Sequence, residues 1–342
     1  MHFTEKKSMI YDLLKAFAIL AVIAGHCLAM FTPDGAIPTV CGSRLLGLLG
    51  SIVYRFHIPC LFVVSGALFA FCWRKGHYHD PQLFLRKKAL RLLVPYLIFG
   101  VALVFPTLVI CGLWAPKGAF SYLLHLLAGD QSRHLWYVYC LFVVYCFFWP
   151  FMRRFENGPW KRIFLLSLVV AVISKYLPFG FLGYFQLCNF LYYQFYFICG
   201  ILLEQNFRDV LYLFHQYPKR IIAVSLGLLI LSLIFGFGSV GSIVYAFAGI
   251  ALIFVLSLYL SENTELHDSK LLRNFVKDSY GIYLFHAMIV YLIFYAFSRV
   301  AFHAYGLAFV AFCVSLFLSW GLTEGCRRLG LGMILGESRM KS

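Results

Sequence analysis

The sequence has little charge. Only 13% of its 342 residues are charged, whereas 62% are hydrophobic. Soluble domains carry about 25% charged residues, so this chain lacks the polar surface that a water-facing globule needs. Apolar runs recur along the whole length, and a run of about 18 or more such residues indicates a membrane span. Backbone groups in lipid must be satisfied internally, which leaves helix bundles or closed barrels. Because these runs do not alternate apolar with polar residues, we predict helices.

Signatures of metal, redox and nucleotide chemistry are also missing. The 11 cysteines are scattered, without a CxxC pair or a Cys/His cluster, so neither a metal site nor a redox pair is indicated. We also expect no disulfide between Cys41 and Cys111. There is no GxSxG, HExxH, P-loop or dinucleotide-binding motif. We therefore expect no metal and no bound cofactor.

We predict one all-α domain over residues 1–342, a polytopic integral membrane bundle of about ten transmembrane helices. A first apolar segment is sometimes a cleaved signal. Here it is long enough to span and has no small-x-small cleavage site, so we expect it to be retained. Pro59 removes a backbone donor from the second run, and we expect a bend or break at residues 56–60. The predicted spans are residues 10–31, 45–72, 90–113, 134–151, 163–177, 181–203, 220–236, 240–260, 279–298 and 303–323.

The net charge of +15 reports topology. With the N-terminus inside, most of the 29 Lys and Arg residues fall on inner segments, and few, such as Arg44, Arg133 and Arg299, fall outside. This bias is the positive-inside rule, and it places both termini in the cytoplasm. The basic loops meet anionic lipid headgroups, so we expect contact with membrane lipids and none with nucleic acid. We expect a multi-pass protein of the bacterial inner (plasma) membrane and leave open a homo-oligomer.

The first span carries ionisable residues. Such residues cost about 2.5–3.5 kcal/mol each on insertion scales and usually face the bundle interior. Lys15 and His26 are eleven positions apart, which puts them about 20° apart on one face and about 16 Å apart along the axis. Asp12 lies one turn before Lys15. The alternative is a snorkelling lysine with a hydrogen-bonded interior histidine, and we favour a functional role.

Three further polar groups lie in or at later spans. Arg55 and His57 precede Pro59 and Ser65-Gly66, and a functional role is favoured there over an interfacial anchor. His134 and Trp136 enter the fourth span, where an aromatic interfacial belt is the better interpretation of these residues alone. Ser279, Tyr283 and His286 follow at i, i+4 and i+7 on one helical face. For this last group, the sequence favours neither a structural polar network nor a functional site over the other.

In this order the four groups resemble the acyltransferase-3 family of integral membrane acyltransferases, which includes O-acetyltransferases of polysaccharides and related sugars. The resemblance covers essentially the whole chain. It departs from the family at Lys15, where the family most often has Arg; lysine keeps the charge but loses the bidentate fork. The matching elements are Lys15 with His26 after ten positions, His57-Ile58-Pro59 with Ser65-Gly66, His134-Leu135-Trp136, and the run from Ser279 to His286.

The resemblance implies transfer of an acyl group, most often acetyl, from cytoplasmic acyl-CoA to a hydroxyl of a glycan or glycolipid. In this hypothesis acetyl-CoA, or another acyl-CoA, is a substrate and His26 is the general base. Lys15 and Asp12 lie on the donor's route. Arg55 or His57 holds the donor or stabilises the oxyanion. The inner basic residues would attract the nucleotide end of CoA: Arg86, Lys87, Lys88 and Arg91. The acceptor side would comprise His134, Trp136, Ser279, Tyr283 and His286.

Other functions fit the same residues. His26 could instead attack the thioester and form an acyl-imidazole. A transporter or flippase for a glycan or lipid-linked sugar would also place charges inside the membrane. Such transporters often show an internal repeat, and none is found here, which favours the enzyme. A structural subunit of a glycan-synthesis complex would leave His26 and Lys15 replaceable without loss of modification.

Overall fold

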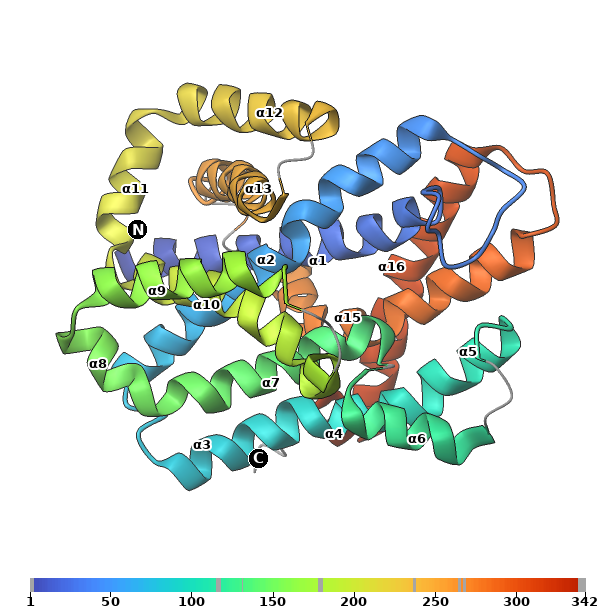
Figure 1. The fold of residues 1–342 in the computed structure, drawn as a ribbon, viewed down its shortest axis with the longest axis horizontal. Helices are drawn as coiled ribbons and strands as arrows, with labels where there is room; N and C mark the ends of the chain where they lie inside the picture. The colour runs from blue at the N-terminus through green and yellow to red at the C-terminus, as the bar shows by residue number, and fades with distance from the viewer. Residues whose placement is uncertain are drawn as a thin grey trace. The chain divides into compact units, whose positions relative to one another are not determined.

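The chain is helical in the computed structural model, which describes residues 3–114, 118–130, 132–177, 181–235, 238–263, 266 and 269–337. No strand occurs within these ranges (Figure 1), and the predicted fold class is confirmed. The helices are α1 Phe3–Ala29, α2 Arg44–Arg74, α3 Pro81–Lys88, α4 Val94–Phe99, α5 Phe105–Ile110, α6 Gly118–Ala128, α7 Trp136–Phe148, α8 Met152–Asn157, α9 Trp160–Ser174, α10 Leu187–Gln205, α11 Phe207–Gln216, α12 Pro218–Ile234, α13 Gly238–Leu260, α15 Lys270–Phe297 and α16 Ala304–Arg328.

The number of spans agrees approximately with the prediction. Within the described residues, eight helices are long and apolar enough to cross a membrane, or nine if α11 and α12, which meet at 89°, count as one span. All ten predicted ranges coincide with helices. The remaining difference between nine spans and the predicted ten comes from α9. Its 15 residues extend only about 22 Å, whereas the hydrocarbon core is about 30 Å thick. Figure 1 shows the corner between α11 and α12.

Prolines are accommodated inside the helices. α3, α4 and α5 are joined by π-helical turns at Ala89–Leu93 and Gly100–Val104, so Pro81–Ile110 forms one 30-residue apolar helix. In α2, Pro59 lies inside a helix of 31 residues that continues on both sides of it. The break at residues 56–60 is therefore wrong, and the alternative expectation, a bend, stays a prediction. Proline removes a single hydrogen bond, and neighbouring helices in a bundle can stabilise the helix across that gap.

The chain forms two compact units. Unit 1 comprises Met1–Val64 and Phe207–Glu324, and unit 2 comprises Ser65–Asn206 and Gly325–Ser342. In unit 1, α2 packs antiparallel to α1, because Gly47 lies against Phe31 and Gly50 against Leu28. A Cβ at Gly50 would stand 3.0 Å from the Leu28 carbonyl carbon, so glycine permits this close approach.

Unit 2 has an aromatic core. Phe69 packs on Phe84, Tyr145 and Phe197, with ring centroids 5.3–5.6 Å apart. Glu204 is only 1% exposed and forms an ion pair with Arg74. Arg74 ends α2 and Glu204 lies in the last turn of α10, so the pair joins two helix ends. Buried charges need such partners because desolvation is costly.

Candidate active site

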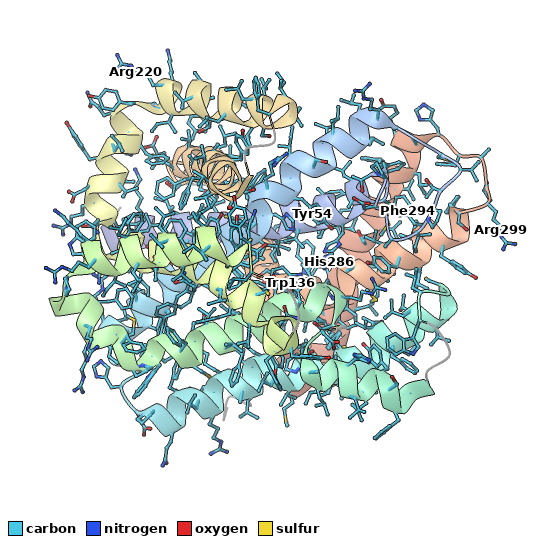
Figure 2. The ribbon with its side chains drawn as sticks, viewed as in Figure 1. Tyr54, Trp136, Arg220, His286, Phe294 and Arg299 are labelled. Atoms are coloured by element: carbon cyan, nitrogen blue, oxygen red, sulfur yellow. The ribbon has the colours of Figure 1, made fainter. Side chains whose placement is uncertain are left out.

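Three histidines and a tyrosine meet in unit 1. The Tyr54 Oη and His26 Nδ1 atoms are 3.3 Å apart, and the His26 and His286 ring centroids are 5.1 Å apart. The ring of Tyr54 also packs edge-on against His57, with centroids 4.8 Å apart. His57 and His286 are almost completely buried, with 2% and 0% exposure. We call these four residues the histidine cluster; Figure 2 labels Tyr54 on α2 and His286 on α15.

The helix packing positions the cluster. α1 and α15 run in the same direction, because Lys15 contacts Val276 and His26 contacts His286 eleven and ten residues later. This is the arrangement expected for the first and ninth spans of an alternating topology. The antiparallel α2 then brings Tyr54 to His26, where Gly25 lies 3.3 Å from the Tyr54 ring, measured from the position its Cβ would take.

Hydrogen bonds fix two of the imidazole tautomers. His57 Nδ1 lies 2.9 Å from the Val53 carbonyl oxygen, and His286 Nδ1 lies 2.7 Å from that of Tyr283. A carbonyl only accepts, so each Nδ1 carries the hydrogen. When neutral, both rings therefore have Nε2 as their basic atom. His26 Nδ1 faces a hydroxyl, which can donate or accept, so both of its tautomers are compatible with the contact.

Lys15 lies on the same face of α1 as His26, and that prediction is confirmed. Its Nζ donates to the Val276 carbonyl at 3.1 Å, and the Ser279 hydroxyl donates to the same oxygen at 2.6 Å. About 16 Å of helix separates Lys15 from His26, so Lys15 lies outside the histidine cluster. Asp12 is partly buried one turn earlier. A polar seam between α1 and α15 thus extends from Lys15 and Ser279 to His26 and His286.

Tyr283 and Arg55 have different surroundings. The Tyr283 ring lies 5.6 Å from His286, measured between centroids, and belongs to the seam. Arg55 faces away from the histidines: its Nη2 donates to the Ser232 carbonyl at 3.0 Å, and its guanidinium carbon lies 5.3 Å from the Tyr245 ring centroid. Positions 55 and 57 are about 200° apart around a helix, so only His57 joins the cluster.

The predicted donor-binding residues on α3 and the following turn belong to unit 2 and do not share one environment. Arg86, Lys87 and Arg91 are exposed. Lys88 is 7% exposed; its Nζ lies 3.7 Å from the Tyr145 ring centroid and donates to the Tyr78 hydroxyl at 3.2 Å. This cation–π arrangement encloses the ammonium, so Lys88 is buried whereas Arg86, Lys87 and Arg91 are exposed.

The predicted residues of the fourth span also belong to unit 2. His134 is buried, with 5% exposure, and the Trp136 and Tyr193 ring centroids are 5.1 Å apart. The hydroxyl of Tyr137, the next residue, lies 3.1 Å from the Ser65 hydroxyl. Figure 2 labels Trp136. The Ser65-Gly66 element and the entry to the fourth span are thus in contact.

Tyr54 is the one member of the histidine cluster that sequence reasoning missed. It stands three residues before His57, and residues at that spacing are neighbours on a helix surface. A tyrosine one turn before a candidate histidine was therefore the available signal. The described residues contain no group of three or more His, Cys, Asp or Glu that could hold a metal ion.

Comparison with protein families connects this arrangement to known chemistry. The acyltransferase-3 family model, described as an acyltransferase domain, matches residues 10–324. Comparisons with the curated proteins and with the solved structures found no match. The matched range includes the whole histidine cluster, the polar seam and all candidate spans except the ends of the first and last. The chain belongs to the acyltransferase-3 family and is a multi-pass membrane acyltransferase.

Proposed function

We propose that this protein is an O-acyltransferase that moves an acyl group, acetyl in the first instance, from cytoplasmic acyl-CoA to a hydroxyl of a glycan or glycolipid. The observation that carries the proposal is the position of His26 between Tyr54, at 3.3 Å, and His286, with ring centroids 5.1 Å apart. Three helices converge there on an imidazole inside a membrane bundle.

His26 acts as the general base in this proposal. It takes the proton from the acceptor hydroxyl as the oxygen attacks the thioester carbonyl. The resulting tetrahedral intermediate then expels the CoA thiolate, which receives the proton, so an ester bond forms as the C–S bond breaks. Tyr54 is close enough to orient His26 or to donate to the oxyanion. In the alternative route, His26 itself attacks the thioester and carries the acyl group until the acceptor arrives.

Donor and acceptor would reach the cluster from opposite sides. His26 lies three residues before the end of α1, on the outer side under the predicted topology. Lys15 and Asp12, about 16 Å and 21 Å closer to the cytoplasm, would lie on the donor's route, and Arg86, Lys87 and Arg91 would attract the CoA phosphates. His134, Trp136 and Tyr283 would shape the acceptor side. Ser279, which shares the Val276 carbonyl with Lys15, would instead lie on the donor's route. Lys88 and Arg55 would contribute least to donor binding, because their charged groups already contact aromatic rings and, for Arg55, a backbone carbonyl.

Mass spectrometry of cell-surface glycans tests the proposal. Cells would express wild type, His26→Ala or His303→Ala at matched levels, where His303 is an exposed histidine outside the cluster. We expect acyl ester with wild type and His303→Ala and none with His26→Ala. Unchanged ester with less exported glycan would instead indicate a transporter and refute the proposal. Labelled acyl group trapped on purified protein without acceptor would select the covalent route.

A further inference from the structure

Unit 2 contains a large apolar groove. It has a volume of about 840 Å³ and lies among α7, α8, α9 and α10. Its walls are mainly aromatic and aliphatic, and Arg154 is the one charged residue among them. Ligand pockets typically measure about 300–1,000 Å³, so the groove is large enough for a hydrocarbon chain. Representative lining residues are Phe147, Phe151, Leu166, Val170 and Phe190.

Under the predicted topology, the groove runs from the cytoplasmic end of α9 and α10 toward the middle of these helices. Arg154 on α8, and Gly158 and Pro159 between α8 and α9, border it at this end. From there it follows α9 from Ile163 to Val170 and α10 from Ile198 back to Phe190, which is about 10–12 Å along each helix. A groove with so few polar groups in its walls favours an apolar occupant.

The charge at the mouth indicates the headgroup. Arg153, Arg154, Lys161 and Arg162 lie within ten residues, with Glu156 as the one acidic residue among them. Arg154 has no ion-pair partner within the described part of the chain, and its guanidinium carbon lies 5.9 Å from the Phe151 ring centroid, at the groove rim. A guanidinium presents a planar fork that matches phosphate oxygens, and the cytoplasmic leaflet carries anionic lipids.

We propose that this groove binds an anionic phospholipid of the cytoplasmic leaflet, with one acyl chain between α9 and α10 and the phosphate on Arg154. The site is separate from the histidine cluster and does not depend on the proposed reaction. The lipid would fill the groove and link the inner loop at α8 to the two helices. A free acyl-CoA would compete for the same groove, and competition with palmitoyl-CoA distinguishes this occupant from the phospholipid.

Native mass spectrometry of the purified full-length protein tests the proposal. The protein, in mild detergent, would be mixed with phosphatidylglycerol or with phosphatidylcholine, and bound lipid counted. We expect one phosphatidylglycerol retained in preference to phosphatidylcholine. Arg154→Ala should weaken that binding about tenfold or more, because it removes a charge-assisted hydrogen bond. The matched change Arg153→Ala, on the same helix α8 but not lining the groove, should weaken it less than threefold.

A second pair of variants tests the acyl chain. Leu165 and Leu166 are 60% and 66% exposed, but only Leu166 lines the groove. Leu166→Trp should block retention, whereas Leu165→Trp should leave it unchanged, and gel filtration checks that both variants fold. Equal retention of the two lipids, equal effects within either pair, or displacement of wild-type lipid by palmitoyl-CoA at equimolar concentration would overturn the proposal.

Discussion

Replacing Tyr54 by phenylalanine removes the hydroxyl that lies 3.3 Å from His26 Nδ1 and leaves the ring in place. The ring keeps its contacts to His26 and His57, with centroids 5.9 Å and 4.8 Å apart. The variant should therefore fold like wild type and differ only in the lost hydrogen bond.

The size of the effect distinguishes two roles. A neutral hydrogen bond contributes about 0.5–1.5 kcal/mol, so if Tyr54 only orients His26, kcat should fall about 2- to 13-fold. If the hydroxyl donates to the oxyanion, the loss should be about 100-fold or more. KM for acyl-CoA should change little in either case, because the hydroxyl faces the imidazole.

The assay is transfer of radiolabelled acetyl from acetyl-CoA by purified protein in nanodiscs to extracted glycan acceptor. Tyr295→Phe is the matched control, since Tyr295 is on α15 and is 45% exposed, against 43% for Tyr54. Wild-type kcat in Tyr54→Phe, or an equal decrease in the control, would refute the role derived for the hydroxyl.

Three further predictions concern packing and the polar seam. Arg74→Ala should destabilise the fold by about 3 kcal/mol, at the low end for a broken buried pair because Arg74 is 43% exposed. Adding Glu204→Gln should restore part of that stability. Thermal unfolding in detergent would measure both variants, and equal melting temperatures for wild type and Arg74→Ala would contradict the pairing. Gly249→Ala should lower the melting temperature, because overpacking against an aromatic ring of α2 costs about 1–3 kcal/mol. The control Gly227→Ala should not, because its Cβ meets nothing within 4 Å. Similar melting curves for the two variants would count against this packing. Lys15→Arg should retain most acetyl transfer and Lys15→Met should lose it, since only the former keeps a cation donating to α15; full activity in Lys15→Met would remove Lys15 from the mechanism.

The spans were predictable because hydropathy and charge bias depend on local composition. Each predicted range coincides with a helix, and helical periodicity alone placed Lys15 and His26 on one face. The same periodicity separates Arg55 from His57 and puts Tyr54 near His57, so the sequence contained enough information to place all three residues.

Other features depend on long-range contacts that no local pattern encodes. Lys88 resembles its basic neighbours in sequence, yet the rings of Tyr78 and Tyr145 enclose it. Pro59 signals a break locally, and α2 nevertheless continues. The division into two units likewise follows from which helices meet, and composition is uniform across the boundary.

The parallel pairing of α1 with α15 has a consequence for biogenesis. Lys15 and its partner Val276 are 261 residues apart, and His26 meets His286 over a similar separation. Membrane insertion proceeds from the N-terminus during synthesis, so α1 enters the bilayer before its partner α15 has been made. The contact between His26 and His286 therefore forms only near the end of translation, and under the proposed mechanism a chain that ends before α15 would be inactive.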